Sequence, residues 1–380
     1  MRVLIVGGGV AGLALAAMLA RQGREPVVAE RVGSYADSGY GISLYPFGSA
    51  VLHGLGAYPG FAAESVELKT YQIADRHGGI IRSIDFARLM AGYGPTYMTA
   101  RGTLIGLLRQ ACGDRAELRM GTTVSALREA GAQVEASLSD GSTGRFDLVV
   151  GCGGIHSVTR ELLFGSQPGV DTGWTGWTWW GRAGIFPPET VREWWLPGAL
   201  FGVYPVPGRA MYLIAVPGAT ASADGLSQTE VRARLRAALG ESALIPEIGA
   251  ALGEASRLWP WPLRDVRSRR LRKGRVVLCG DAGTAFLPTA GVGASAALRC
   301  AAALADEPSR ADARLVPLAL DHYLERTTGP VRAHQRDSRR LARAMFLRSN
   351  ALCRARDAAT RHMPIRSMIG SILAAMHERV

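Results

Sequence analysis

Glycines and an acidic side chain near the N-terminus are spaced in a way that could bind a dinucleotide. Gly7, Gly9 and Gly12 follow an apolar run in G-x-G-x-x-G spacing. Gly7 permits a tight turn, Gly9 leaves room for a pyrophosphate near the backbone, and Gly12 lets a helix pack closely on the preceding strand. A second apolar run over residues 27–30 ends in Glu30, whose carboxylate could accept hydrogen bonds from a ribose diol. An ordinary glycine-rich turn is the alternative, but it does not require this order of elements.

Two later segments also combine a buried strand with glycines. Residues 146–154 hold an apolar run that ends in glycines, and residues 274–281 hold another that ends in Asp281. Glycines at the end of a buried strand let the backbone approach a ligand, and a carboxylate there needs partners to be tolerated. The loop 286–293 then opens an alanine-rich helix over residues 294–305. All three segments are predicted to face one nucleotide.

The composition indicates a chain that can bury a large core. It has 380 residues, of which 48% are hydrophobic, and single cores stop growing near ~250–300 residues, so we expect two domains. Five scattered cysteines without C-x-x-C pairing are typical of reduced core residues. The chain begins directly on its first strand and has no apolar run of about 18 residues. We therefore expect a cytoplasmic protein without an integral membrane span.

The positive charge does not by itself indicate a nucleic-acid partner. The net charge is +12, but only Lys69 and Lys273 among the 44 basic residues are lysines, which is more typical of a coding bias than of a phosphate-binding surface. Basic residues cluster over 264–275 and 332–366. The first cluster could attract a phosphorylated cofactor, whereas a solvated face is the simpler interpretation. We expect no nucleic-acid partner.

The elements between the motifs are predicted from periodicity and turn residues. Residues 174–217 contain six of the eight tryptophans between Pro and Gly punctuation, which indicates a separate antiparallel sheet. A hairpin turned at Gly78 and Gly79 is expected to belong to a different sheet from the nucleotide-binding strands. The expected helices cover 46–54, 101–111, 228–239 and 317–380 with breaks at Pro330 and Pro364; the other expected strands cover 67–73, 80–84, 121–126, 133–139 and 144–146.

Three nucleotide-facing segments in this order, with a tryptophan-rich sheet between the second and third, resemble the group A flavoprotein monooxygenases, the family of FAD-dependent aromatic hydroxylases. The resemblance covers residues 1 to about 340 and is most specific at Gly280, Asp281, Pro288 and residues 291–293, which distinguish FAD enzymes of this fold from NAD dehydrogenases. It implies an α/β fold with a Rossmann-like FAD-binding domain of the GR2 type, an inserted antiparallel β-sheet substrate domain and C-terminal helices. The implied boundaries are 1–70, 96–172 and 266–325 for the FAD-binding domain, 71–95 and 173–265 for the substrate domain, and 326–380 for the C-terminal helical segment.

The resemblance also implies roles for individual residues. Glu30 would bind the adenosine ribose, Arg101 the FAD phosphate or ribityl region, and Asp281 the ribityl chain. For Arg101, an exposed position on a surface helix is the alternative. The loop 288–293 would lie along the pyrimidine edge of the flavin, where the following helix N-terminus stabilises negative charge on reduced flavin. The implied cofactor-binding residues are Gly7, Gly9, Ala11, Gly12, Glu30, Arg31, Gly41, Ile42, Arg101, Val124, Gly154, Asp281, Pro288, Gly291, Val292, Gly293 and Ala294.

The implied activity is that of an FAD-dependent monooxygenase. It would use NADPH or NADH and O2 to hydroxylate or epoxidise a small aromatic or polycyclic molecule through a flavin C4a-hydroperoxide, in bacterial secondary metabolism. Such chemistry needs no catalytic nucleophile and no metal from the protein. The expected substrate pocket includes Trp177, Trp179, Trp195 and Tyr204, with Trp177 and Trp179 on one face of a strand, although plain core packing is the alternative. A monomer or a homodimer is expected.

Departures from the family pattern leave other functions open. Gly153 stands where the family usually carries an acid near the nicotinamide region, and Thr284 replaces a common histidine. An FAD-containing non-redox cyclase or isomerase would tolerate the missing acid, and a flavin-binding regulator is a further alternative. A flavin-dependent halogenase is suggested by Trp259-Pro-Trp-Pro-Leu263, but the only candidate for its lysine is Lys69, so we expect both tryptophans to fill the crossing between domains.

The end of the chain is predicted to form an amphipathic helix. Residues 363–376 place apolar side chains near i, i+3, i+4 and i+7 spacing. This helix could lie on a membrane surface. Packing against the flavin domain or a second subunit is the interpretation that we favour.

Overall fold

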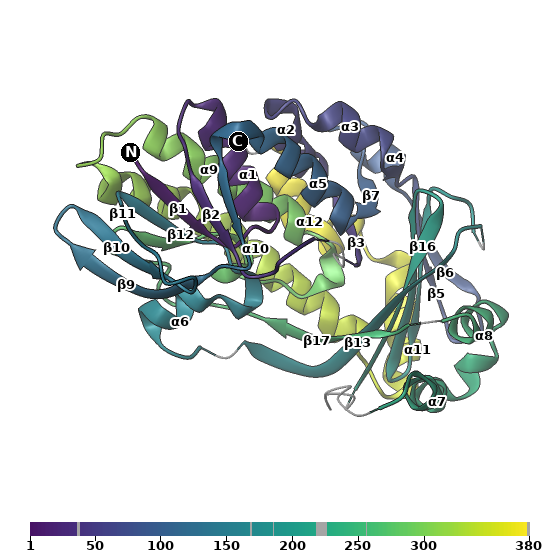
Figure 1. Ribbon diagram of the computed structural model, residues 1–380. Helices are drawn as coiled ribbons and strands as arrows, with labels where there is room; N and C mark the ends of the chain where they lie inside the picture. Colours follow the sequence, from purple (N-terminus) through teal and green to yellow (C-terminus); the bar gives the residue numbers. More distant parts are fainter. Residues whose placement is uncertain (36–38, 168, 185, 218–225, 256, 378–380) are drawn as a thin grey trace.

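Two sheets and their helices make up most of the molecule. The computed structural model describes residues 1–35, 39–167, 169–184, 186–217, 226–255 and 257–377. In Figure 1 the sheet that contains β1 and its helices lie on the left, and a second, larger sheet lies on the right with α7 and α8 on its outer side. The fold is of the expected α/β class, with antiparallel sheets and C-terminal helices.

The first sheet brings the three predicted motif strands together. Its strands lie in the order β18 (Arg272–Lys273), β19 (Val276–Leu278), β12 (Leu148–Gly151), β1 (Val3–Val6), β2 (Val27–Glu30) and β8 (Glu117–Met120). All neighbours except β18 and β19 pair in parallel. The carboxyl ends of β1, β12 and β19 therefore meet at one edge, where ligands bind in open parallel sheets.

Alternation along β1 explains how this sheet is covered on both faces. Val3 and Ile5 pack in one core cluster with helices α1 (Val10–Arg21), α5 (Arg101–Cys112) and α9 (Gly293–Ser309). Leu4 and Val6 belong to a different cluster, formed with the meander of β9 (Val124–Ala130), β10 (Gln133–Leu138) and β11 (Thr143–Phe146). Successive side chains of a strand point to opposite faces, so an uninterrupted apolar run is what a sheet buried on both sides requires.

The predicted start of one strand in this region is wrong, although residues 124–126 do lie in a strand. Residues 121–126 were expected to form a single strand, but the chain turns at Gly121, where φ is +70°, between the end of β8 and the start of β9. Glycine adopts this left-handed conformation without the steric cost that a side chain would add. The turn sends β8 into the parallel sheet and β9 into the meander.

The second sheet has seven strands and contains the predicted tryptophan-rich region. Their order is β17 (Trp259–Asp265), β13 (Val170–Arg182), β16 (Arg209–Pro217), β15 (Ala199–Val206), β14 (Thr190–Leu196), β5 (Thr70–Ala74) and β6 (Ile80–Asp85). The hairpin of β5 and β6 joins this sheet through β14. This confirms the prediction that the hairpin belongs to a different sheet from β1, β2 and β12. Helices α7 (Gln228–Leu239) and α8 (Pro246–Gly253) pack on one face, and α10 (Val316–Met345) contacts the other.

A small sheet and short helices connect these two parts. The strands β3 (Gly41–Leu44), β7 (Tyr97–Ala100) and β4 (Val66–Glu67) form a three-stranded antiparallel sheet. Helix α2 begins at Pro46 and ends at Gly54, as predicted, and the remaining short helices are α3 (Tyr58–Ala63), α4 (Phe86–Met90) and α6 (Val158–Phe164).

The C-terminal helices cover the junction of the two larger sheets. Helix α10 continues through Pro330, so the predicted break there is wrong. Buried residues on both sides of the proline, such as Thr327 and Val331, keep the helix packed despite the missing N–H group. The predicted break at Pro364 is confirmed, because it separates α11 (Asn350–His362) from α12 (Ile365–His377).

The apolar face of α12 is covered by protein. Ile369, Ile372 and Ala375 are buried in a cluster with residues of the small sheet and of the loop before α9. This contact confirms the expectation that the helix packs on the part of the chain for which flavin binding was predicted. Within the described part of the chain, no helix has the length and apolar character needed to cross a bilayer.

Candidate functional site

A cavity of about 650 Å³ lies between the two larger sheets. Its size is within the range of ligand pockets, about 300–1,000 Å³. One end is lined by the three motif segments, and the other by the seven-stranded sheet, α10 and α12. All predicted cofactor-binding residues except Gly12, Val124 and Val292 border it.

The first glycine motif has the geometry that its spacing predicts. Gly7 has φ +113°, and a Cβ atom there would lie 2.5 Å from the carbonyl oxygen of Cys152. A Cβ atom at Gly12 would lie 1.9 Å from the carbonyl oxygen of Gly7, so Gly12 acts through close helix packing and does not border the cavity. Gly9 caps α1 without a side-chain hydrogen bond, and no acid occupies the first turn. The helix N-terminus therefore offers N–H groups and partial positive charge to an anion.

Glu30 lies next to this glycine-rich turn. Its carboxylate accepts hydrogen bonds from the N–H of Gly8 at 2.6 Å and from the N–H of Val32 at 2.9 Å. The hydroxyl of Tyr35 donates to the carbonyl oxygen of Gly8 at 2.9 Å. Sequence reasoning missed Tyr35, because a tyrosine in a glycine- and serine-rich loop carries no motif signal.

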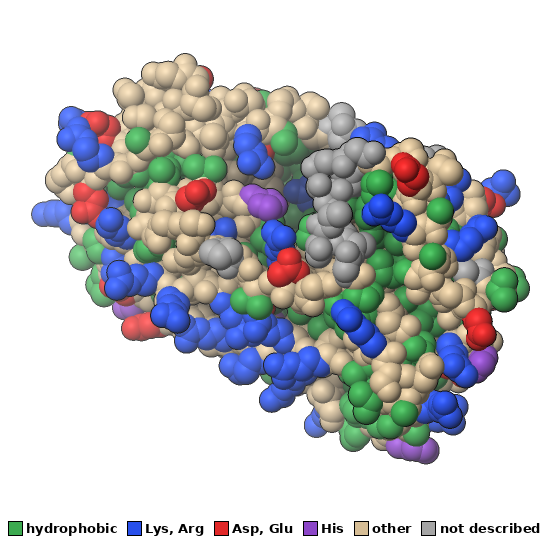
Figure 2. Space-filling model, turned by 90° about the horizontal axis from the view of Figure 1, so that it is seen from below, with side chains coloured by type: hydrophobic (Ala, Val, Ile, Leu, Met, Phe, Trp, Pro, Cys, Tyr) green, Lys and Arg blue, Asp and Glu red, His purple; other side chains and the backbone are tan. Residues whose placement is uncertain are grey.

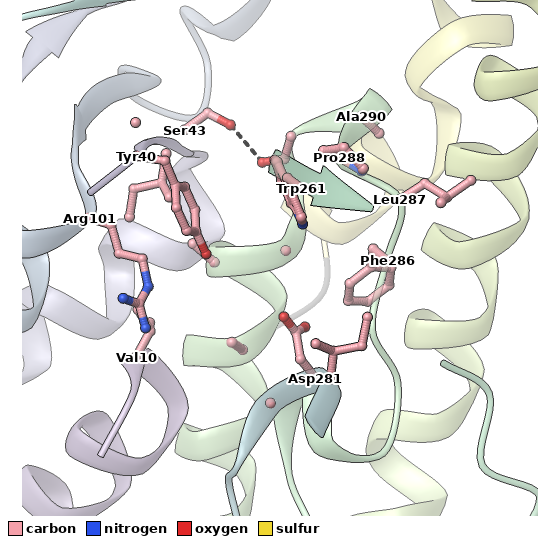
Figure 3. A pocket seen from close by; sticks show the side chains of 18 of the residues that line it. Val10, Tyr40, Ser43, Arg101, Trp261, Asp281, Phe286, Leu287, Pro288 and Ala290 are labelled. Carbon is pink, nitrogen blue, oxygen red and sulfur yellow. Dashed lines mark hydrogen bonds between the residues drawn. The ribbon is translucent and has the colours of Figure 1, made fainter. Parts of the chain in front are cut away.

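Arg101 lies inside the cavity and not on the surface. It is the first residue of α5, and a Cβ atom at Gly9 would lie 3.8 Å from its guanidinium. The guanidinium stacks over the ring of Tyr40 at 5.6 Å, and Tyr40 in turn stacks on Trp261 at 5.4 Å (Figure 3). The two aromatic residues were not predicted as site residues; Trp261 was expected only to fill the crossing between domains.

Asp281 faces the same cavity from the turn after β19 (Figure 3). This turn is η4 (Gly280–Ala282). The side chain is open to the cavity, but it lies deep within the protein. Desolvation raises the pKa of Asp281 to about 6, and the positive charge of Arg101 opposes that rise. A carboxylate in this position can accept hydrogen bonds from ligand hydroxyl groups.

Side-chain hydroxyls from another part of the chain donate hydrogen bonds to backbone carbonyl oxygens of the loop before α9. It contains η5 (Pro288–Ala290) and Gly291, which has φ +61°. The hydroxyl of Ser43 donates to the carbonyl oxygen of Gly291 at 2.6 Å (Figure 3). The hydroxyl of Tyr45 donates to the carbonyl oxygen of Ala290 at 3.0 Å. Gly293 and Ala294 border the cavity at the N-terminus of α9. Val292 was predicted to bind cofactor, but its side chain is 1% exposed and packs in the core.

The segment after β12 is hydrogen-bonded to the turn after β19 through Arg160. The buried guanidinium of Arg160 donates to the carbonyl oxygens of Ala282 at 2.8 Å and Ile155 at 2.7 Å. It thereby joins the turn of Asp281 to η2 (Gly154–His156). Gly153, the departure from the family pattern, borders the cavity, and a Cβ atom there would lie 3.2 Å from the Cα of Ser157. Any side chain at this position would press on its neighbour.

Four of the remaining predicted side chains do not face the cavity. Val124 packs in the core between the parallel sheet and the meander, and its neighbour Thr123 borders the cavity instead. Trp177 and Trp179 share a face, as predicted, but it is the face that packs against α7 and α8. The predicted pocket role is therefore wrong for both, because alternation along β13 sends them outward. Trp195 is 1% exposed and lies behind the cavity wall.

Tyr204 does border the cavity, and it belongs to a polar cluster that the sequence did not reveal. The carboxylate of Glu193 accepts hydrogen bonds from the hydroxyls of Tyr204 at 2.7 Å and Tyr71 at 2.5 Å, and from the indole N–H of Trp195 at 3.0 Å. Burial raises the pKa of Glu193, and these three donors oppose the rise. No motif or spacing marks a single glutamate that precedes two tryptophans in a strand.

Arginines of both predicted basic clusters meet at a second, smaller cavity. It has a volume of about 280 Å³ and is lined in part by Arg267, Arg269, Arg332 and Arg336. Figure 2 shows a band of lysine and arginine side chains on one face of the molecule. Within the described ranges, no cluster of three or more His, Cys, Asp or Glu side chains is placed to hold a metal ion.

The arrangement in the larger cavity fits a dinucleotide with a polyhydroxyl chain. The turn at Gly7 has no room for a side chain, and the uncapped N-terminus of α1 and the cation of Arg101 suit a pyrophosphate. Glu30 and Asp281 place carboxylates at two separate points along the cavity, where hydroxyl groups could donate to them.

Comparison with known proteins agrees with this geometry. A family described as the FAD binding domain matches residues 1–307. The chain is 31% identical over 311 residues to aurachin C monooxygenase/isomerase of Stigmatella aurantiaca, covering 80% of this chain and 79% of that protein. It is 31% identical over 378 residues to 3-amino-4-hydroxybenzoate 2-monooxygenase of Streptomyces cremeus, covering 94% and 90%. The structure of Klebsiella pneumoniae HpxO complexed with FAD and uric acid superposes with a TM-score of 0.87 at 22% identity, covering 99% of this chain and 96% of that one.

Proposed function

This chain belongs to the group A FAD-dependent monooxygenases, and from that premise we propose that it uses NADH or NADPH and O2 to insert one oxygen atom into a small aromatic or polycyclic molecule in bacterial secondary metabolism. The observation that carries the proposal is the continuity of one cavity from the nucleotide-binding turns to an apolar compartment. A cofactor held at one end can therefore reach a substrate at the other within the same cavity.

Different residues along the cavity would bind different parts of the cofactor. The N-terminus of α1 and Arg101 would bind the pyrophosphate, Glu30 the adenosine ribose, and Asp281 the ribityl chain. The loop 288–293 and the N-terminus of α9 would bind the edge of the flavin ring. Bound FAD supplies the reaction of reduced flavin with O2 and the transfer of one oxygen atom.

The remaining residues would orient the substrate and exclude water. Leu341 and Met345 of α10 and Ile365, Met368 and Ile369 of α12 line the apolar compartment. Water exclusion suppresses side reactions of the activated oxygen and strengthens every polar contact in the site. Helix α12 would thus complete the active site, in addition to packing on the core.

Two rival functions are a flavin-dependent halogenase and an isomerase. The halogenase interpretation needs a lysine between flavin and substrate, but Lys69 pairs with Glu189 at 2.8 Å, and its side chain is 49% exposed. The isomerase interpretation has more support, because the Stigmatella relative is named both a monooxygenase and an isomerase. A rearrangement that follows oxygen insertion is compatible with the same cavity.

Oxygen insertion is tested with isotopically labelled O2. The purified holoenzyme, a nicotinamide donor and a panel of phenols, aminophenols and quinolones are incubated under the labelled gas. Incorporation of one labelled atom into an organic product supports the proposal. Consumption of substrate to an isomeric product without the label would favour non-redox chemistry, and release of all reduced oxygen as hydrogen peroxide with every compound would argue against a monooxygenase of aromatic rings.

A further inference from the structure

The substrate end of the cavity contains one buried carboxylate whose hydrogen bonds are already made. Glu193 is 5% exposed and borders the cavity together with Tyr71 and Tyr204. One carboxylate oxygen accepts from Tyr204, and the other accepts from Tyr71 and from the indole of Trp195. Three donors satisfy most of the acceptor capacity of an ionised carboxylate. The cluster is therefore built around a negative charge.

Because of this arrangement, the two tyrosines can only accept hydrogen bonds from a ligand. Each phenol has one hydrogen to donate, and both hydrogens are directed to Glu193. Burial raises the pKa of both phenols, so they remain protonated and continue to donate. What remains at each tyrosine oxygen is a lone pair. A ligand that meets Tyr71 or Tyr204 must therefore supply the hydrogen.

Positive charge is confined to the opposite end of the cavity. Among the described residues that line it, the basic ones are Arg31, Arg101 and His156, which lie beside the nucleotide-binding segments. Arg356 lies beyond Trp195, over whose ring it stacks, and its guanidinium pairs with Asp357 at 2.7 Å. Apart from the Glu193 cluster, the substrate end is lined mainly by apolar side chains, among them Leu68, Ile84, Phe86, Met98, Val191, Leu200, Met211 and Leu213.

Resting on the proposed function, we propose that the substrate is an uncharged, lipophilic aromatic molecule that donates an O–H or N–H group to the Tyr71–Glu193–Tyr204 cluster, and that this cluster excludes carboxylate-bearing rings. A buried negative charge repels an anionic ligand, and none of the described residues that line this end of the cavity supplies a cation to compensate for it. A phenol, an aromatic amine or the N–H tautomer of a quinolone has the required donor. Glu193 acts here as a specificity-determining residue through the tyrosines.

This specificity would differ from that of some relatives. The Streptomyces relatives are named for 3-amino-4-hydroxybenzoate, and a Bordetella bronchiseptica relative for 6-hydroxynicotinate, both of which are carboxylates. The inference therefore predicts that the printed substrates of these relatives are poor ligands of this chain, although their rings carry suitable donor groups.

The test measures binding and does not depend on turnover. Isothermal titration calorimetry of the FAD-loaded protein compares 3-amino-4-hydroxybenzoate, its methyl ester, and the same ester with its nitrogen and oxygen fully methylated. The ester is expected to bind about tenfold or more tightly than the acid, and more tightly than the methylated ester, because only the free ester is both uncharged and a donor. Equal or tighter binding of the acid, equal binding of the methylated ester, or no binding of the free ester would each overturn the inference.

Matched variants assign the effect to the cluster. Glu193→Gln keeps the shape but needs an acceptor for its amide hydrogens, and Tyr204→Phe removes one lone pair from the cavity. Glu193→Gln removes the charge and is expected to reduce the ratio of ester to acid affinity to below about threefold, whereas Tyr204→Phe removes an acceptor and is expected to reduce the ratio of free-ester to methylated-ester affinity. Tyr212→Phe is the control for both ratios, because Tyr212 lies in the cluster on the outer face of the same sheet and donates to the carbonyl of Arg182. If Glu193→Gln or Tyr204→Phe left its own ratio unchanged, or Tyr212→Phe lowered either ratio, the assignment would be wrong. Oxygen incorporation measured separately shows whether the proposed function holds when this specificity fails.

Discussion

The hydroxyl of Ser43 donates a 2.6 Å hydrogen bond to the carbonyl oxygen of Gly291, and this bond ties β3 to the loop that precedes α9. The two residues are 248 positions apart in the sequence. Gly291 adopts φ +61°, which glycine reaches without steric cost, so the hydrogen bond from Ser43 is what restrains the loop at this permissive position. The contact thus fixes the loop proposed to hold the flavin edge.

Removing this hydroxyl should weaken cofactor binding without unfolding the protein. Ser43→Ala leaves the Gly291 carbonyl without its donor, at a cost of about 1 kcal/mol, which corresponds to about fivefold weaker FAD binding. The dissociation constant is measured by flavin fluorescence during reconstitution of the apoprotein. Ser125→Ala is the control, because that hydroxyl bonds to Ser137 on the exposed meander. An unchanged affinity in Ser43→Ala would mean that the loop does not depend on this bond.

A double-mutant cycle on Ser43 and Gly291 tests their contact through FAD affinity. A Cβ atom at Gly291 would lie 2.5 Å from the Ser43 hydroxyl but 3.6 Å from its Cβ. Gly291→Ala alone should therefore be costly through both strain and collision, and Ser43→Ala should relieve the collision. We expect the double variant to bind FAD more tightly than the sum of the two single effects predicts, by about 1 kcal/mol of coupling. Strict additivity would contradict the close contact.

Arg160 should matter for the turn that presents Asp281. Arg160→Met would leave the carbonyl oxygens of Ala282 and Ile155 without partners inside the protein, and a loss of about 2–3 kcal/mol of unfolding free energy is expected. Urea unfolding measures this loss, and Arg264→Met is the control because its ion pair with Asp171 is half-exposed. If both variants were equally stable, Arg160 would not join the two motifs.

Acid should weaken the attachment of α12 through His334. This residue is 3% exposed, stacks on Phe47 and hydrogen-bonds with Ser371 of α12 at 3.0 Å. Burial, aided by the charge of Arg299, lowers its pKa to about 4. The unfolded chain then binds the proton first as pH falls below about 6.5, so stability present at pH 7 is lost on the way to pH 4.

The expected loss between pH 7 and pH 5 is about 2 kcal/mol of unfolding free energy, and His334→Gln should remove that part of the pH dependence. Urea unfolding at the two pH values measures it. A His334→Gln variant with the full wild-type pH dependence would show that another group is responsible.

The cofactor end of the site was largely predictable because local sequence determines its geometry. Gly7, Glu30 and Asp281 each stand at the end of an apolar strand, and parallel strands bring such ends to one edge. The tryptophans and Glu193 were not predictable in the same way. Which face of β13 or β14 meets the cavity depends on strand pairing and on α7 and α8, and a shift of one residue reverses every side chain.

The predicted break at Pro330 failed for a related reason. A proline disfavours a helix locally, but α10 is held by tertiary contacts with the helices α9 and α12. Tyr40 and Trp261, which stack in the cavity, come from segments far apart in the sequence, and no local pattern predicted that they would meet. Long-range packing therefore decided the features that sequence patterns missed.

The central claim is that this chain binds FAD and passes electrons from a nicotinamide to O2. The most direct measurement is the visible spectrum of the purified protein during anaerobic addition of NADH or NADPH, with and without the uncharged aminophenol ester, followed by admission of O2. We predict a yellow protein whose flavin bands bleach with one of the donors and return with O2, despite the glycine at position 153. A colourless protein that takes up no FAD, or bound flavin that stays oxidised with both donors, would contradict this account.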